Sequence, residues 1–414
     1  MTSPGTPGVE SWLRKAKDRY GEIAAISPRM KGLRAYLNWA RANAEMLFRT
    51  RRVDARPLKL TFDPVNICQL QCPLCPTGLR IHDRDPGHAR LHLFEKLMEE
   101  LGDYVFFLDL YNWGEPLLNV HLEEMIEMAS RKNVTSYVST NLSLKLSAER
   151  IDRLVASGLG ELICSLDGAT PETYATYRRQ GNFELALSNM RRIVEAKRRL
   201  GVTRPAIVWR FYVFRFNEHE IERARALAAD VGVDRFVLGS PFLDEGRYPI
   251  PDADRKAMGD WATTLPAFNR YAPAHPEFAD PAATGARRSR CDWHYVSTAI
   301  NPDGGVAPCC AVYERSNDFG VLGEGPSGTY MEVVNNEKFR SIRDRFAGRP
   351  GAPTGLVCET CPVPAIMDYG RILNRQILMF TFVELAEFLR RPLRALVRHR
   401  PSAAAAVQTR GAGR

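Results

Sequence analysis

The chain has 414 residues, enough for one large domain and a smaller one with a sizeable buried core. Hydrophobic residues make up 45% and charged residues 25%, the balance of a globular protein. No stretch reaches the roughly 18 apolar residues of a membrane span, and the N-terminus carries no apolar secretory segment, so we expect a cytoplasmic protein. The net charge of +9 fits an anionic partner, or only a solvated, arginine-rich surface.

The chain starts with basic, helix-prone sequence, and its hydrophobic pattern then changes. Residues 1–57 are predicted to form an N-terminal basic helical extension, because apolar residues recur there at helical spacing. From residue 58, short β-prone runs alternate with longer amphipathic segments. The predicted strands are 58–62, 104–111, 134–140, 161–167, 206–213 and 235–240. The predicted helices are 91–101, 121–131, 147–157, 184–200 and 217–231.

This alternation predicts an α/β fold with a parallel sheet, and six units indicate a partial (β/α)6 barrel over residues 58–240. In barrels of this kind the chemistry lies at the carboxyl ends of the strands. Residues 241–290 are rich in proline, aspartate and alanine and are predicted to form a linker. Residues 291–370 are irregular and carry their own cysteines, and residues 371–414 are predicted to be an amphipathic helix with a basic tail.

The first cysteine group follows the first predicted strand. Cys68, Cys72 and Cys75 have the spacing CX3CX2C. Because the nine cysteines fall mostly into two groups, metal ligation is favoured over disulfides. Three thiolates on a tight loop can hold three irons of a [4Fe–4S] cluster and leave the fourth iron open. Zinc is the alternative, although a structural zinc usually takes four ligands in paired CX2C units.

This spacing, directly after the first strand of a (β/α) repeat, resembles the radical S-adenosylmethionine (SAM) superfamily. The resemblance implies that the open iron binds SAM and that an electron from the cluster cleaves it to methionine and a 5′-deoxyadenosyl radical. That radical would abstract a hydrogen atom from the substrate. An external electron donor such as flavodoxin or ferredoxin is implied as a partner. Leu74 departs from the family, which usually has an aromatic residue before the third cysteine.

The resemblance continues at the ends of the next strands. The second strand ends in NWGEP, which matches the family's GGE motif with tryptophan in place of the first glycine. The match implies that backbone groups at Gly114, supported by Glu115, bind the amino group of SAM. It also implies that Ser139 and Asn141 hydrogen-bond its ribose and carboxylate. Asp167, in the SLDG segment, either contacts the ribose or the substrate or caps a turn.

A second group of cysteines lies near the C-terminus. Cys291 and Cys309 flank a hairpin-like segment with Gly304 between them, and Cys358 and Cys361 form a CX2C pair. Four such thiolates can enclose one [4Fe–4S] cluster, or hold zinc. Together with the first group they resemble a twitch domain, the shortened form of the SPASM auxiliary-cluster domain. A cluster closed by four thiolates favours electron transfer over substrate binding.

Cys310 directly follows one of these ligands, and its role is open at this stage. It is a bystander, a ligand exchanged for Cys309, or a catalytic hydrogen-atom donor to a substrate radical. The C-terminal helix is apolar in the middle and basic at its end, so it either docks on the barrel or makes a weak contact with an anionic membrane surface. No basic segment shows the aromatic interleaving of an RNA-binding platform, so we expect no nucleic acid.

We therefore predict a radical SAM enzyme with two [4Fe–4S] clusters, one SAM-binding and one auxiliary. The expected reaction is oxidation of a small molecule, such as a sugar or aminocyclitol alcohol, with the auxiliary cluster accepting an electron. Radical epimerisation and modification of a sugar, a lipid-linked substrate or a ribosomal peptide are the alternatives. Residues 1–57 are too short and too poor in β-sequence for a leader-peptide-binding domain, which favours the small molecule. A zinc-binding scaffold protein without redox chemistry is the alternative of another class.

Overall fold

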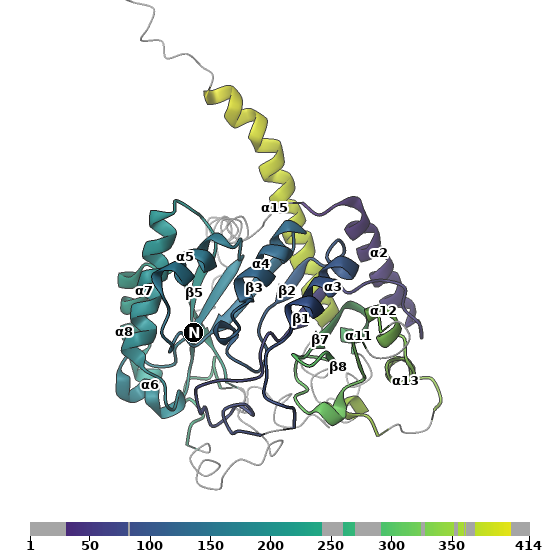
Figure 1. Cartoon of the computed structure of the whole chain (residues 1–414), viewed down its shortest axis with the longest axis horizontal. Helices are drawn as coiled ribbons and strands as arrows, with labels where there is room; N and C mark the ends of the chain where they lie inside the picture. The colour runs from purple at the N-terminus through teal and green to yellow at the C-terminus, as the bar shows by residue number, and fades with distance from the viewer. Residues whose placement is uncertain are drawn as a thin grey trace, which may run out of the picture.

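The computed structural model describes residues 30–81, 83–241, 260–269, 291–323, 328–351, 355–359, 361 and 369–398 (Figure 1). Most of the predicted linker, the first 29 residues and the end of the basic tail lie outside these ranges. The domain boundaries drawn from the sequence therefore stay a prediction. Within the described part of the chain, no helix is long and apolar enough to cross a membrane.

The core of the fold is one sheet with the strand order β6-β5-β4-β3-β2-β1-β7-β8-β9. Neighbours from β6 to β7 are parallel, whereas β8 and β9 run antiparallel to the strands before them. The sheet is open at β6, as the partial barrel requires. Its strands are β1 (Lys59–Phe62), β2 (Phe107–Asp109), β3 (Thr135–Thr140), β4 (Glu161–Ser165), β5 (Ala206–Tyr212), β6 (Arg235–Gly239), β7 (Ser297–Ile300), β8 (Gly305–Ala307) and β9 (Gly320–Val321).

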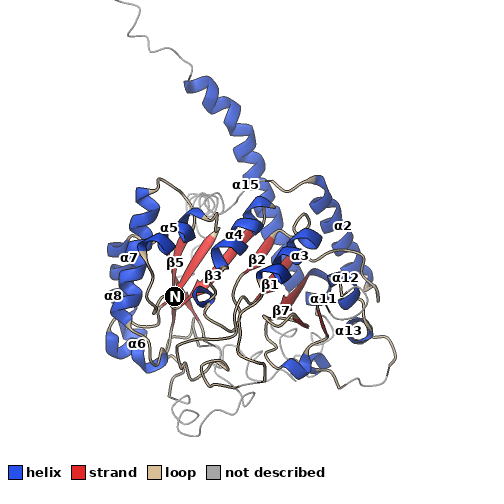
Figure 2. Ribbon diagram, viewed as in Figure 1, coloured by secondary structure: helices blue, strands red, loops and turns tan. Residues whose placement is uncertain are grey.

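Helices between the parallel strands cover one face of this sheet (Figure 2). They include a short helix, α6, that the sequence did not reveal because its seven residues show no helical periodicity. The helices of this layer are α3 (Leu91–Leu101), α4 (Leu122–Arg131), α5 (Ala148–Ala156), α6 (Pro171–Tyr177), α7 (Phe183–Arg199) and α8 (Ile221–Val231). Elsewhere lie α2 (Leu33–Phe48), α11 (Trp293–Val296), α12 (Tyr330–Val333), α13 (Glu337–Phe346) and α15 (Tyr369–Arg398).

The two faces of the sheet differ in chemistry because side chains alternate along each strand. On β5, Trp209 packs its ring against Phe236 of β6, and the guanidinium of Arg225 from α8 lies 5.4 Å from the centre of the Phe236 ring. These residues therefore mark the helix-covered face. The alternate residues Arg210 and Tyr212 belong to the opposite face, here called the inner face. The inner face is polar, which is unusual for a buried sheet and points to a ligand there.

Helix α15 covers the inner face near the amino ends of the strands. Phe380 packs edge-on against Phe107 with 4.9 Å between ring centres, and the Gln376 side chain donates a hydrogen bond to the Tyr137 hydroxyl. This confirms that the C-terminal helix docks on the barrel. The helix is longer than expected, because residues 390–398 continue it where a basic tail was predicted.

The predicted hairpin between Cys291 and Cys309 is present, and its first strand, β7, also joins the sheet of the barrel, which the sequence did not reveal. β7 pairs in parallel with β1 along its whole length, so the hairpin extends the sheet of the barrel. The predicted turn after Asn301 is present, and β8 returns antiparallel to β7. The pairing with β1 joins segments more than 200 residues apart, which no local pattern in the sequence encodes.

Arg84 fastens the loop after β1 to this hairpin. Its guanidinium donates to the Tyr313 carbonyl and forms ion pairs with Asp303 at 2.9 Å and Asp318 at 2.6 Å. The arginine side chain is only 1% exposed and that of Asp318 only 7%. Removal of one partner from such a buried pair leaves an uncompensated charge.

We expect Arg84→Met to lower the free energy of unfolding by about 3–5 kcal/mol, measured by urea denaturation followed by circular dichroism. Arg315→Met is the matched control, because Arg315 is 55% exposed and its ion pairs with Asp85 and Asp303 are 4.0 Å long. The control should change stability by less than about 0.5 kcal/mol. Equal effects of the two substitutions would contradict a structural role for Arg84.

Candidate functional site

The loop after β1 brings the three cysteines of the first group together. All three are free thiols. Burial raises the pKa of Cys68 and of Cys72 to about 12, and the charges of neighbouring cysteines add to both shifts. The Cys68 sulfur accepts a hydrogen bond from the backbone N–H of Leu70 and lies 3.7 Å from the Asn141 amide nitrogen. The group is therefore a buried set of thiols that would lose protons on binding a metal.

Glu115 ties the second and third strand ends to this loop. Its carboxylate accepts hydrogen bonds from the Thr140 hydroxyl at 2.6 Å and from the Asn141 N–H at 2.8 Å. Its own N–H donates to the Ile67 carbonyl, one residue before Cys68. Burial raises the pKa of Glu115, and these hydrogen bonds act in the opposite direction. The side chain predicted to support SAM thus holds its neighbours in place.

Gly114 lies where no side chain fits. A Cβ there would come within 1.7 Å of the Val65 carbonyl oxygen, so the GGE-like turn and the cysteine loop touch backbone to backbone. Asp63, at the end of β1, accepts a hydrogen bond from the N–H of Trp113 at 3.0 Å. Burial raises the pKa of Asp63 to about 7, against several backbone hydrogen bonds. The sequence analysis missed Asp63, although a charged residue directly after an apolar strand was a visible signal.

Asp167 is fully buried and has two strong partners. Its carboxylate forms an ion pair with Arg178 at 2.6 Å and accepts a hydrogen bond from the Tyr212 N–H at 2.7 Å. Arg178 also lowers the pKa of Cys72 by charge and by a side-chain hydrogen bond. The sequence analysis missed this arginine, because nothing in the sequence showed that the residue after α6 turns towards the cysteines. Asp167 therefore orients a cation beside the first cysteine group.

Ser139 lies on the inner face of β3, two residues before Asn141. Its hydroxyl is 3.3 Å from that of Ser165 on β4. Ser165 is the register partner of Arg210 on β5. A band of polar groups thus crosses three strands just below their carboxyl ends. The predicted SAM contacts Glu115 and Asn141 lie together with Cys68, whereas Ser139 belongs to this band.

The second cysteine group also converges. Burial raises the pKa of Cys291 to about 12, and the charge of Cys361 adds to this shift. The pKa of Cys358 rises through burial and through the charges of Cys291 and Cys361. The pKa of Cys309 is raised by burial and by nearby cysteines, Cys310, Cys358 and Cys291 in that order. The fold therefore brings together Cys291, Cys309 and the CX2C pair of Cys358 and Cys361.

Cys310 has different surroundings from Cys309. Burial and the charge of Asp109 raise the pKa of Cys310 to about 11, and the nearby Lys59 acts in the opposite direction. Lys59 and Asp109 form an ion pair at 2.7 Å on the inner face of β1 and β2. The thiol therefore lies between the second cysteine group and the inner face. Its predicted role as a hydrogen donor stays a prediction.

Both cysteine groups fit iron–sulfur clusters in their donor chemistry. Each offers thiols whose pKa is raised by burial and that repel one another when ionised, so that a cation is needed to compensate them. Within the described ranges, no three His, Cys, Asp or Glu side chains are close enough for a single metal ion. The absence of a side chain at Gly114 lets the GGE-like turn pack directly on the backbone of the loop that carries the first group.

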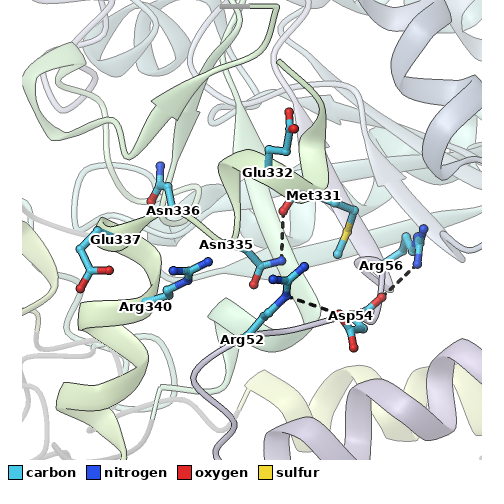
Figure 3. A pocket seen from close by; sticks show the side chains of 9 residues that line it. All are labelled: Arg52, Asp54, Arg56, Met331, Glu332, Asn335, Asn336, Glu337 and Arg340. Carbon is cyan, nitrogen blue, oxygen red and sulfur yellow. Dashed lines mark hydrogen bonds and ion pairs between the residues drawn. The ribbon is translucent and has the colours of Figure 1, made fainter. Parts of the chain in front are cut away.

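A separate surface groove of about 560 Å³ lies between the segment after α2 and helices α12 and α13 (Figure 3). Its lining mixes arginines and acids, and Arg52 pairs with Asp54 inside it. None of the predicted site residues lines this groove. We therefore place the chemistry at the strand ends, where charge and burial converge, and not in this groove.

The comparisons with known proteins agree with this placement. The radical SAM superfamily model matches residues 63–239, and the model of the SPASM iron–sulfur cluster-binding domain matches residues 291–362. The chain belongs to the radical SAM superfamily and carries a C-terminal SPASM-type domain, and its cofactors are SAM and [4Fe–4S] clusters. It is a radical SAM enzyme.

Among curated proteins, the chain is similar to the mycofactocin maturase MftC of several mycobacteria. It is 25% identical over 307 residues to that of Mycobacterium tuberculosis, covering 73% of this chain and 76% of the relative. The Mycobacterium ulcerans protein is 29% identical over 305 residues, covering 72% and 80%. Among solved structures, Streptococcus suis SuiB bound to SAM gives a TM-score of 0.54 at 15% identity, covering 81% and 77%, which shows the shared fold.

We expect Gly114→Ala to reduce 5′-deoxyadenosine formation by about 100-fold, because the added methyl group must displace the backbone beside the first cysteine group. Gly87→Ala in the same loop is the control, since its Cβ would have no neighbour nearer than 3.9 Å. Chromatography of the assay products measures both. If Gly114→Ala kept wild-type activity, the turn would have no role in seating SAM.

Proposed function

We propose that this enzyme cleaves SAM at the first cysteine group and uses the resulting radical to oxidise its substrate, with Cys68, Cys72 and Cys75 as cluster ligands. The observation that carries the proposal is the convergence of these thiols with the Glu115 network and Arg178 at one edge of the sheet. The bound cluster and SAM would supply a 5′-deoxyadenosyl radical. An external donor such as flavodoxin or ferredoxin would supply the electron.

The surrounding residues account for how SAM is held. Gly114 presents backbone groups to the amino end of the methionine, while Glu115 fixes the backbone at Asn141. Arg178 offers a guanidinium beside Cys72, suited to a carboxylate, and Asp167 holds that guanidinium in place. Asp167 thus acts as a positioning residue for Arg178.

Cys291, Cys309, Cys358 and Cys361 are proposed to hold the auxiliary cluster. Because β7 is paired with β1, this cluster would be attached to the same sheet as the first one. A rigid connection of this kind suits electron transfer between two centres and the substrate. The function of the auxiliary site is therefore to remove the electron left on the substrate after hydrogen abstraction.

The substrate class is proposed to be a peptide. The relatives are named maturases, and SuiB, which shares the fold, is described bound to a precursor peptide, SuiA, with a TM-score of 0.54. These names favour a peptide over the small sugar or aminocyclitol alcohol expected from the sequence. The small molecule remains an alternative that substrate screening decides.

Arg210 is proposed to bind an oxyanion group of the substrate. Among described residues, it has no carboxylate partner, and only the phenols of Tyr111 and Tyr212 approach its guanidinium. The pair with Tyr212 is 3.5 Å long, a weak hydrogen bond. Three other cations of the inner face and the strand ends are paired with carboxylates, Lys59 with Asp109, Arg178 with Asp167, and Arg235 with Glu161.

The first experiment is to reconstitute the protein with iron and sulfide without oxygen. We expect about eight irons per chain and 5′-deoxyadenosine formation with SAM and dithionite. Cys72→Ala should leave about four irons and abolish 5′-deoxyadenosine. Cys358→Ala should also leave about four irons but keep SAM cleavage, so each variant is the control for the other. Tight zinc, no iron and no 5′-deoxyadenosine would refute the proposal.

Epimerisation with Cys310 as hydrogen donor is the second candidate, favoured by the position of this thiol between the second cysteine group and the inner face. The same assay, run in deuterated water, separates the two reactions. Deuterium in the product, lost in Cys310→Ser, would establish hydrogen donation. A two-electron oxidised product without deuterium would establish oxidation.

We expect Arg210→Met to raise the KM for the substrate at least about tenfold, while substrate-independent 5′-deoxyadenosine formation stays unchanged. Arg210→Lys should recover part of the loss, since it keeps the charge but not the two-pronged geometry. Phosphate, carboxylate and amide versions of the substrate identify the group that is bound. A loss of SAM cleavage in Arg210→Met would instead place Arg210 in the SAM site.

A further inference from the structure

Helices α2 and α15 form an antiparallel pair on the outside of the fold. The Trp39 indole donates to the Asn374 side chain at 2.7 Å, and the Thr381 hydroxyl donates to the Tyr36 hydroxyl at 3.5 Å. As the residue number rises along α2, it therefore falls along α15. Figure 1 shows both helices towards the top of the molecule, with α15 running on beyond the sheet.

This pair exposes most of the large apolar side chains found at the surface. Among described residues, twelve large hydrophobic side chains are exposed, and eight of them belong to these two helices; the other four are Met30, Val120, Leu200 and Val237. The eight are Leu33, Leu37, Leu47 and Phe48 on α2, and Ile372, Leu378, Phe382 and Leu385 on α15. Such a concentration marks a surface that has a partner.

The two sets lie on the same side of the pair. On α2, Leu37 follows the contact residue Tyr36 by one position and Leu47 follows Asn43 by four; on α15, Phe382 and Leu385 follow Thr381 by one and by four. At 100° per residue, this turns the exposed set to the same rotational side of its contact line. Because the helices are antiparallel, equal rotations bring both sets to one face. We call these eight residues the α2–α15 platform.

Among the described side chains of these two helices, the exposed charged groups are positive. Arg34 and Arg41 on α2 and Arg375 on α15 are exposed. The acids of the described side chains on the two helices are Glu45, which is buried, and Glu384, which is half-buried. An apolar face bordered by exposed arginines is the pattern of helices that lie in a lipid headgroup layer.

We propose that the α2–α15 platform docks on an anionic lipid surface. A second copy of the chain fits less well, since a two-fold interface would bring arginines against arginines. Lipid contact buries the apolar side chains in the acyl boundary while the arginines reach the headgroup phosphates. The first cysteine loop leaves the carboxyl end of β1, whereas α15 covers the amino ends of the strands, so docking leaves the SAM site accessible.

The test is flotation of the reconstituted full-length protein with vesicles of phosphatidylcholine alone or mixed equally with phosphatidylglycerol. The wild type should float with the anionic vesicles, and less so at high salt. Leu37→Glu combined with Phe382→Glu should reduce the bound fraction at least about tenfold, because two charges would enter the acyl boundary. Val120→Glu, at a side chain 65% exposed outside the platform, is the matched control and should bind like the wild type.

Unchanged 5′-deoxyadenosine formation in the double variant would show that the fold is intact, so this test is independent of the enzyme's chemistry. Equal binding of the double variant and the wild type would overturn the proposal. So would failure of the wild type to float with anionic vesicles. A wild-type dimer in light scattering that the double variant converts to a monomer would assign the platform to a second copy and overturn the lipid proposal.

Discussion

Strand β1 is hydrogen-bonded in parallel on both sides, to β2 and to β7, and the rest of the site depends on this pairing. The first cysteine loop leaves its carboxyl end, the GGE-like turn leaves β2 beside it, and the second cysteine group brackets the hairpin that starts with β7. The N–H of Asp63 donates to Ile300, so the pairing continues into the loop itself. Four residues of backbone thus fix two cysteine groups to one frame.

Three carboxylates are buried around this frame, and burial of a charged carboxylate is unfavourable for the free energy of folding. Asp63, Glu115 and Asp167 are buried, and burial raises the pKa of the first two. Each is held by backbone N–H groups or an arginine, and each fixes a segment that touches the first cysteine group. Unfavourable burial of charged groups is typical of functional sites, because apolar residues would be more stable at these positions.

The carboxyl ends of the strands and the side of the molecule that carries α15 present different kinds of side chain. At the carboxyl ends of the strands, polar side chains line an inner face that an apolar core would otherwise fill. On the other side, α15 closes the inner face with Phe380 and exposes Phe382 only two residues later. One helix therefore contacts the core and an outer surface at once, since residues two positions apart are about 200° apart around the helix axis. The helix continues beyond the sheet as far as Arg398 (Figure 1).

The sequence by itself determined the class of fold, the six parallel strands and the CX3CX2C cysteine motif, because hydrophobic periodicity and cysteine spacing are local properties. It also marked Glu115, Asn141 and Asp167 as polar residues at strand ends. Only the tertiary structure decided that β7 joins β1 and that Arg178 reaches Cys72, since both contacts connect segments whose local sequences carry no record of each other. The same holds for Arg210, whose distinguishing feature is a missing carboxylate partner among the described residues, a property of its surroundings and not of its position in the chain.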